Sequence, residues 1–172
     1  IKEDYLRILR YVRFFLSYSK HDHQFNVKKV IKQNIKGVIN LSKERLFDEL
    51  QKLVLSKGFV KLGKDVFCKE IILLIFPQLK NIDIFNKLSK NAQSIIHKKD
   101  FIFLLALLLI DETDNSDYFL YKFNVSNEAK KRINFLKEIY NRSVDKKIFL
   151  KNNLKKIYYF HGKSFLLDIY TS

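Results

Sequence analysis

The chain has 172 residues, 47% of them apolar, with one proline and four glycines, and its net charge is 33 − 18 = +15. This composition provides for a sizeable core and excludes long disordered tracts, collagen-like repeats and proline-rich linkers. The single cysteine, Cys68, excludes an internal disulfide and favours a reducing, cytoplasmic location. The longest apolar run, over residues 101–110, is shorter than the roughly 20 residues that cross a bilayer, so no membrane association is expected.

Apolar residues recur at three- and four-residue spacing from the N-terminus onward, which predicts a series of helices. The first helix is expected over residues 3–18. A polar turn that contains His21 and His23 follows. A short helix is then expected from about Val27, and Gly37 is expected to end it in the left-handed conformation common after helices.

Ser42 is a typical N-cap, so a further helix is expected from there to about Ser56. Two glycines mark a connector over residues 58–63. The next helix is expected over residues 64–76, because Pro77 cannot continue it. Additional helices are predicted over residues 82–90, 99–112, 127–142, 145–158 and 163–170.

The fold class is predicted to be all-α with no sheet, because no alternation of period two and no hairpin dipeptide occurs. Ser126 is expected to cap the helix over 127–142. The connector divides the chain into two predicted regions, a packed helical unit over residues 1–57 and a helical lobe over residues 64–172.

Arginines gather near the N-terminus. Lysine outnumbers arginine 27 to 6, yet Arg7, Arg10 and Arg13 lie within the first 13 residues. Arginine is favoured over lysine where a planar fork of donors is needed. On a helix, Asp4 and Arg7 are neighbours on one surface strip, which the other two arginines continue. One interpretation is a surface salt bridge with solvated arginines, which contributes about 0–1 kcal/mol.

The second interpretation is recognition of a nucleobase. A carboxylate only accepts hydrogen bonds and a guanidinium only donates them. Side by side, Asp4 and Arg7 match the amino group and ring nitrogen on the pairing edge of cytosine or adenine. Uracil and guanine present a carbonyl where the amino group would be, so the carboxylate would repel them. Arg10 and Arg13 would then lie one and two turns further on, able to contact the triphosphate or the ribose.

The segment Glu3-Asp4-x-x-Arg7, followed by Ile8-Leu9-Arg10-x-x-Arg13-Phe14, resembles the neck motif of class II tRNA nucleotidyltransferases, the CCA-adding enzymes, and of their poly(A) polymerase relatives. The stretch over residues 41–50, Leu-Ser-Lys-Glu-Arg-Leu-x-x-Glu-Leu, is similar to the next motif of that family. Weaker similarity covers residues 104–111, 125–128 and 162–168.

The resemblance implies that residues 1–57 form a nucleotide-templating neck and residues 64–172 a tRNA-binding body and tail. Asp4 and Arg7 would template the incoming base, and Arg10 and Arg13 would also contact the nucleotide. The residues implied to support this site are Glu3, Glu44, Arg45 and Glu49. The expected substrates are ATP and CTP, the expected partner is tRNA, and no stable protein partner is expected.

In that family a catalytic head with paired aspartates holds Mg²⁺ upstream of the neck, and this sequence contains no such head. The chain is therefore expected to be inactive alone. It also lacks methionine and starts at Ile1, so it is expected to belong to a longer protein. Two alternatives stay open. The chain could be part of a poly(A) polymerase that adds only AMP, or a free-standing helical RNA-binding module.

Other candidate sites favour plain structural explanations. His21 and His23 flank an aspartate in a polar turn, which is typical of exposed loop residues, so no metal site is predicted. The acidic stretch over residues 111–117 lacks the central glycine of a calcium loop and is expected to be a solvated connection. Cys68 has no catalytic partner pattern and is expected to pack in the core.

The net charge favours binding to a polyanion, and RNA is the expected one. Most aromatic side chains are expected in the core. The segment over residues 158–161, Tyr-Tyr-Phe-His, could instead stack on RNA. Lysines that could accompany it or contact tRNA phosphates are Lys155, Lys156 and Lys163, together with Lys130, Lys131, Lys146 and Lys147.

Overall fold

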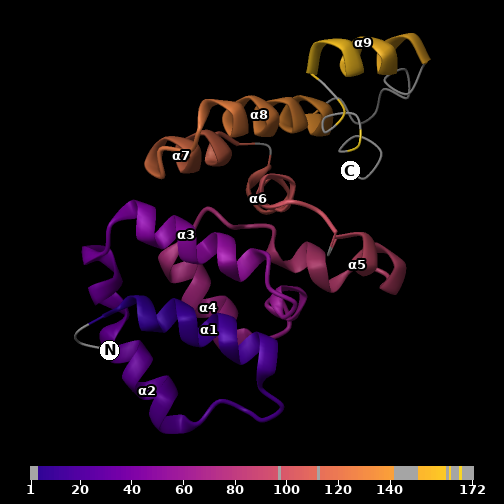
Figure 1. The fold of residues 1–172 in the computed structure, drawn as a ribbon. Coiled ribbons are helices and arrows are strands. Elements are labelled where there is room, and N and C mark those ends of the chain that lie inside the picture. Colours follow the sequence, from indigo (N-terminus) through magenta and orange to yellow (C-terminus); the bar gives the residue numbers. More distant parts are fainter. Residues whose placement is uncertain are drawn as a thin grey trace. The chain divides into compact units, whose positions relative to one another are not determined.

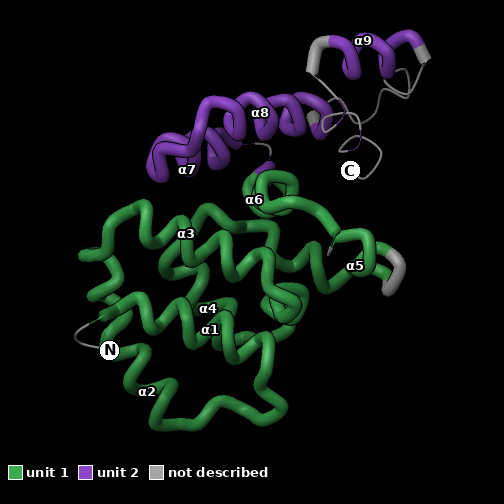
Figure 2. The backbone as a smooth tube through the Cα atoms, in the orientation of Figure 1, with its two compact units in different colours: residues 1–109 green, residues 110–172 purple. Residues whose placement is uncertain are grey.

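The computed structural model describes residues 4–96, 98–111, 113–141, 151–161, 163 and 167. Within these residues every regular element is a helix and none is a strand, so the predicted all-α class is confirmed (Figure 1). The chain forms two compact units, residues 1–109 and 110–172 (Figure 2). The predicted connector over 58–63 thus lies inside the first unit, and the assignment of functions to 1–57 and 64–172 stays a prediction.

The first unit contains α1 (Leu6–Tyr18), α2 (Phe25–Asn34), α3 (Lys43–Val54), α4 (Val66–Ile75), α5 (Lys90–Ile96) and α6 (Phe101–Leu109). Three 3₁₀ turns connect them, η1 (Ile35–Asn40), η2 (Phe59–Lys61) and η3 (Ile82–Asn86). The second unit contains α7 (Asn115–Lys122), α8 (Asn127–Asn141) and α9 (Lys151–His161). No helix among the described residues is both long and apolar enough to span a bilayer.

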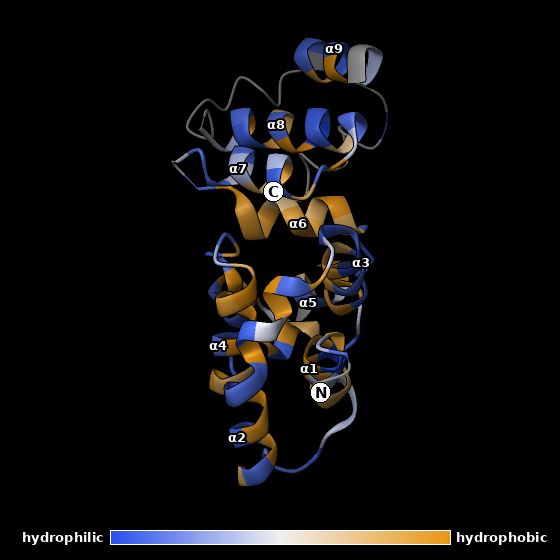
Figure 3. Ribbon diagram, turned by 90° about the vertical axis from the view of Figure 1, so that its left-hand side faces the viewer, coloured by the Kyte–Doolittle hydropathy of each residue, from blue (hydrophilic) through white to orange (hydrophobic). Residues whose placement is uncertain are grey.

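The core of the first unit forms where α1 and α3 lie side by side (Figure 1). Ile8 and Val12 of α1 and Leu50 and Leu53 of α3 have no exposed surface, which the three- and four-residue spacing predicts. Helix α6 is apolar on all sides and appears orange along its length in Figure 3. Its residues are almost all buried, and it begins where the Asp100 carboxylate accepts two backbone N–H groups.

Two predicted caps are confirmed. The amide of Arg45 donates to Ser42 Oγ over 3.3 Å at the start of α3. The amide of Ala129 donates to Ser126 Oγ over 3.3 Å at the start of α8. A hydroxyl at this position satisfies an amide that has no partner inside the helix. Capping residues therefore fixed the beginnings of these helices from sequence alone.

The helix predicted over residues 82–90 is wrong. The chain forms η3 there, and α5 starts only after Ser89, whose hydroxyl accepts the amide of Ala92 over 3.2 Å. Ile82 and Phe85 are both 1% exposed. Their three-residue spacing places both on one side of a 3₁₀ turn, which has three residues per turn.

Helix α7 is an element that the sequence analysis missed, since residues 111–117 were expected to be a connection. The turn before it closes on Asp111, whose carboxylate accepts the amide of Thr113 over 2.9 Å. Helix α7 then buries Phe119 and Leu120. The sequence does not indicate this helix clearly, because its first half is polar or acidic and only its second half carries apolar side chains.

The expected role of Gly37 is also wrong. The chain continues from α2 through Gly37 into η1, and the glycine is not in the left-handed conformation. A Cβ atom at this position would overlap the ring of Tyr5. Gly37 is therefore required for the close approach of Tyr5, the N-cap residue of α1.

Gly58 and Gly63 provide a matched pair of substitutions. A Cβ atom on Gly58 would overlap the backbone of Leu16 and Ser17, whereas one on Gly63 would meet only the side-chain amide of Asn86, at 2.7–2.9 Å. We expect Gly58→Ala to lower the free energy of unfolding by about 1–3 kcal/mol, because packed backbone must shift. Gly63→Ala should cost clearly less, because an exposed amide can rotate. Urea denaturation of both variants tests this, and equal losses would contradict it.

Candidate nucleotide and RNA interface

Asp4 lies just before α1 and is held at one of its two carboxylate oxygens. Oδ1 accepts the amide of Leu6 over 3.1 Å and lies 3.3 Å from Nη2 of Arg45 on α3. Within the described residues Oδ2 has no hydrogen-bond partner. The side chain is 27% exposed. One oxygen of Asp4 is thus fixed in place while the other can accept a hydrogen bond from a ligand.

The start of α3 is organised by Ser42, Glu44 and Arg45. The pKa of Glu44 is lowered because its carboxylate accepts its own backbone N–H and the hydroxyl of Ser42. This cap orients the first turn of the helix, from which Arg45 reaches Asp4. Glu44 therefore stabilises the helix start. Glu3, the other predicted supporting residue at this end, lies outside the described residues.

Glu49 of α3 lies between two arginines of α1. Its carboxylate is 1% exposed, and Oε1 accepts Nε of Arg13 over 2.6 Å. Oε2 lies 3.7 Å from Nε of Arg10. Burial of an unpaired carboxylate is costly, so this pairing explains why a charged residue lies inside the α1–α3 contact. Arg10 keeps 48% of its side chain exposed.

The Arg7 side chain is exposed on α1 and forms no hydrogen bond or ion pair within the described residues. It lines a pocket of about 370 Å³ whose other walls come from α1 and α2. The remaining lining residues are Tyr11, Asn26, Val27, Val30 and Ile31. The guanidinium therefore stands beside a mostly apolar hollow with all of its donors available.

All four predicted nucleotide-binding residues thus lie at or near the surface. Arg45 joins Asp4, and Glu49 joins Arg10 and Arg13, so the predicted supporting residues of α3 contact the predicted binding residues of α1. The backbone amide of Arg7 donates to the carbonyl oxygen of Asp4 over 3.2 Å, but within the described residues their side chains form no hydrogen bond or ion pair with each other. Their role as a pair that templates a base stays a prediction.

A second hollow, of about 750 Å³, lies between α2 and the start of α4. Its lining residues are Phe25, Lys28, Lys29, Lys32, Gln33, Val66, Phe67 and Glu70. Phe25 is 77% exposed and Val66 80% exposed, beside three lysines. An exposed aromatic ring among cations is a surface suited to stacking a base while the cations contact phosphates. The sequence analysis did not single out these residues.

Only some of the C-terminal candidate residues belong to the part of the chain that the structure describes. Tyr158 and Tyr159 on α9 are 56% and 82% exposed, and Lys155 and Lys156 are exposed as well. Lys146 and Lys147 lie outside the described residues, and so do most of residues 162–168. The predicted contact of this segment with RNA stays a prediction.

The expectation that His23 is an exposed loop residue is wrong. Its side chain is 9% exposed, and its Nε2 atom lies 3.0 Å from both carboxylate oxygens of Asp65. Cys68 is buried, as expected, but its Sγ lies 3.7 Å from the same nitrogen. No local motif could have indicated this cluster, because it joins residues more than 40 positions apart.

Comparisons with known proteins indicate which proteins the chain is similar to. A family model described as a probable RNA- and SrmB-binding site of polymerase A matches residues 24–82. The CCA tRNA nucleotidyltransferase 1, mitochondrial, of Mus musculus is 33% identical over 133 residues, which is 76% of this chain and 30% of the relative. The protein of that name from Homo sapiens is 32% identical over 117 residues, 66% of this chain and 26% of the relative.

The chain thus spans 26–30% of the length of these two relatives. No solved structure matches the chain. The matched family model covers α2 to the start of η3 and therefore includes the hollow around Phe25. The predicted resemblance is confirmed, and the chain is similar to part of a tRNA nucleotidyltransferase or poly(A) polymerase-like protein.

Proposed function

We propose that this chain is the nucleotide- and RNA-binding portion of a tRNA nucleotidyltransferase that adds CMP and AMP to tRNA 3′ ends. The relatives are named CCA tRNA nucleotidyltransferases, and the description of the matched family model includes RNA binding. One observation supports templating most directly. Asp4 is fixed through Oδ1 with Oδ2 left without a partner among the described residues, and Arg7 carries an unpaired guanidinium on the same helix start.

In this proposal the nucleotide base meets Asp4 and Arg7 through its pairing edge. The carboxylate accepts the amino group of cytosine or adenine, and the guanidinium donates to the neighbouring ring nitrogen. Arg45 and the Leu6 amide hold the carboxylate still, so little ordering is needed when the base arrives. Arg10 has exposed donors for the phosphates or ribose, while Glu49 holds Arg13.

The chemical step is not assigned to this chain. The family resemblance implies Mg²⁺, which prefers oxygen ligands in octahedral geometry. Among the described residues the cluster of metal-ligating side chains is His23, Asp65 and Cys68, whose nitrogen and sulfur donors do not suit that ion. Mg²⁺ is therefore proposed to bind at groups outside the described residues, while Asp4 and Arg7 contact the base of ATP or CTP. The cytoplasmic location stays a prediction, since the relatives are named mitochondrial.

Asp4→Ala tests the templating role in the full-length protein that carries this chain. Loss of a hydrogen bond to a charged group costs about 1.5–3 kcal/mol, so preference for CTP over UTP should fall roughly 10- to 100-fold. The measurement is kcat/KM for each nucleotide. Arg45→Ala removes one partner of the Asp4 carboxylate but leaves the carboxylate itself present, so most of the preference for CTP over UTP should remain. Unchanged preference in Asp4→Ala would contradict the role. Comparing CTP with ATP also distinguishes CCA addition from addition of AMP alone.

Glu49→Gln tests the support of the arginines. The substitution keeps the volume but leaves Arg13 and Arg10 without their buried anion, so the free energy of unfolding should fall by about 1–3 kcal/mol and nucleotide affinity should fall with it. Glu70→Gln is the matched control, because Glu70 pairs with Lys32 at the surface. This substitution should lower the free energy of unfolding by less than about 0.5 kcal/mol. Equal effects of the two variants in denaturation and nucleotide titration would refute the assignment.

Phe25→Ala tests the RNA surface. Stacking of a base on an aromatic ring is worth about 1–3 kcal/mol, so tRNA affinity should weaken roughly 5- to 150-fold. Tyr121→Ala removes an equally exposed aromatic ring outside the hollow and should leave affinity unchanged. Filter binding at several salt concentrations measures both, and affinity should fall steeply with salt. Identical affinities of the wild type and Phe25→Ala would argue against this surface.

A further inference from the structure

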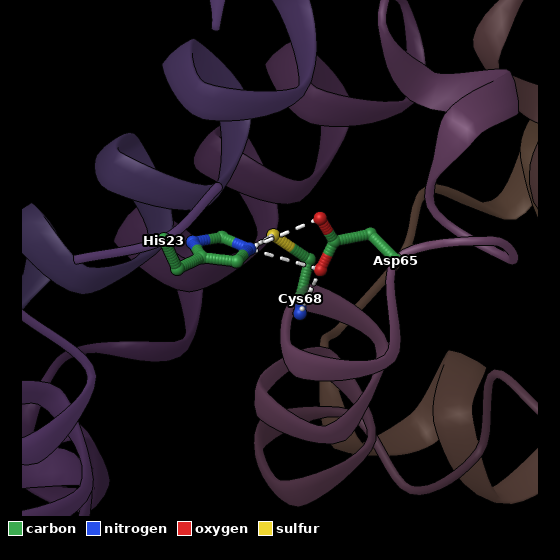
Figure 4. Close-up of side chains that lie close together, drawn as sticks. All are labelled: His23, Asp65 and Cys68. Atoms are coloured by element: carbon green, nitrogen blue, oxygen red, sulfur yellow. Dashed lines mark hydrogen bonds and ion pairs between the residues drawn. The ribbon is translucent and has the colours of Figure 1, made fainter. Parts of the chain in front are cut away.

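His23, Asp65 and Cys68 bring a nitrogen, a carboxylate and a sulfur to one point in the first unit (Figure 4). His23 lies in the loop between α1 and α2. Asp65 is the N-cap of α4 and Cys68 lies in that helix's first turn. Nε2 is 3.0 Å from each oxygen of Asp65 and 3.7 Å from Sγ of Cys68, and all the ligand atoms lie within 4.8 Å of one another.

The surrounding residues hold this arrangement in place. The imidazole of His23 is stacked on Phe15 with ring centroids 3.6 Å apart, and it meets the edge of Phe67 at 4.8 Å. Its other nitrogen, Nδ1, is 2.7 Å from the hydroxyl of Tyr11. A partner on the second ring nitrogen is what orients a histidine toward a metal ion.

We propose that His23 Nε2, the Asp65 carboxylate and Cys68 Sγ bind a zinc ion, with water in the fourth position. Zinc accepts these three donor types in tetrahedral geometry, and its usual bond lengths place neighbouring ligand atoms about 3.3–3.6 Å apart. The separations of 3.7 Å and 3.0 Å lie close to that spacing, and the three ligand atoms lie within 4.8 Å of one another. A thiolate and an imidazole together disfavour magnesium and calcium, which require oxygen donors.

Zinc binding moves one proton within the His23 ring and releases one proton from Cys68. With a neutral ring, Nε2–H donates to Asp65 and the Tyr11 hydroxyl donates to Nδ1. When zinc binds the Nε2 lone pair, the ring proton moves from Nε2 to Nδ1. The Nδ1–H group then donates a hydrogen bond to the hydroxyl oxygen of Tyr11. The Cys68 thiol loses its proton to solvent. Each zinc ion therefore releases about one proton, so affinity rises with pH.

Burial, followed by the charge of Asp65, raises the pKa of the Cys68 thiol well above its usual range. The thiol therefore stays protonated until a metal displaces its proton. Burial, followed by the charges of Cys68 and Asp65, also raises the pKa of Tyr11 to about 12, which keeps its hydroxyl protonated at neutral pH.

A bound ion would link the loop before α2 to the first turn of α4. These two helices provide the walls of the hollow around Phe25 and its lysines. The ion would therefore fix the spacing of that hollow, and removing it would allow the two helix starts to separate. This structural role does not depend on the proposed CCA-adding activity.

Cobalt(II) in place of zinc provides a direct test on the full chain. Because Cys68 is the chain's single cysteine, a thiolate-to-cobalt charge-transfer band reports that residue alone. We expect one equivalent of cobalt to produce this band together with tetrahedral visible bands, and zinc to abolish both.

Three variants complete the test, each checked for folding by circular dichroism. Cys68→Ala should abolish the charge-transfer band and weaken zinc binding at least tenfold in calorimetry. His23→Gln should weaken zinc binding to a similar extent. His21→Ala is the matched control, because His21 is an exposed neighbour and should bind zinc as the wild type does. The proposal is overturned if the wild type gives no charge-transfer band, or if folded Cys68→Ala binds zinc with wild-type affinity.

Discussion

Three ion pairs join α3 to α1 and to the residue Asp4 that precedes it, and they set the geometry on which the candidate nucleotide site depends. At one end Arg45 of α3 reaches Asp4, and further along the buried Glu49 holds Arg13 and approaches Arg10. Between and behind them the two helices bury apolar side chains completely. The apolar contact fixes the distance between the helices, and the charged pairs fix their register. Binding residues of one helix are therefore positioned by supporting residues of the other.

The burial of Glu49 shows most clearly how a residue of α3 positions the arginines of α1. A carboxylate with 1% exposure would destabilise the fold if it stood alone, since its charge has left water. Arg13 provides a short hydrogen bond and Arg10 a second, longer contact. Arg10 keeps much of its guanidinium at the surface, so a single buried anion both satisfies the core and leaves donors for a ligand.

Local signals in the sequence predicted much of the fold. Ser42 and Ser126 marked helix starts because a capping hydroxyl acts on its own neighbours, and the spacing of apolar residues predicted the buried side of α1. Long-range relations could not be predicted. Gly37 is required by the Tyr5 ring, and His23 meets Asp65 and Cys68 only because the loop after α1 packs against the start of α4.

The candidate site divides in the same way. Sequence motifs indicated Asp4, Arg7, Arg10 and Arg13 together with their supporting residues on α3, and the structure adds which residue holds which. The hollow around Phe25 was not predicted, because its lysines and its aromatic ring are separated from Val66 by some forty residues and no local pattern joins them. Its exposed ring and positive charge became evident only after α2 and α4 were placed.

The central claim is that the Asp4 carboxylate accepts the amino group of the incoming base. The most direct measurement compares kcat/KM for CTP with that for an analogue lacking the 4-amino group, in the wild type and in Asp4→Ala of the full-length protein. The account predicts a preference for CTP of roughly tenfold or more in the wild type that nearly disappears in the variant, since a hydrogen bond to a charged group is worth about 1.5–3 kcal/mol. An equal preference in both proteins would contradict it.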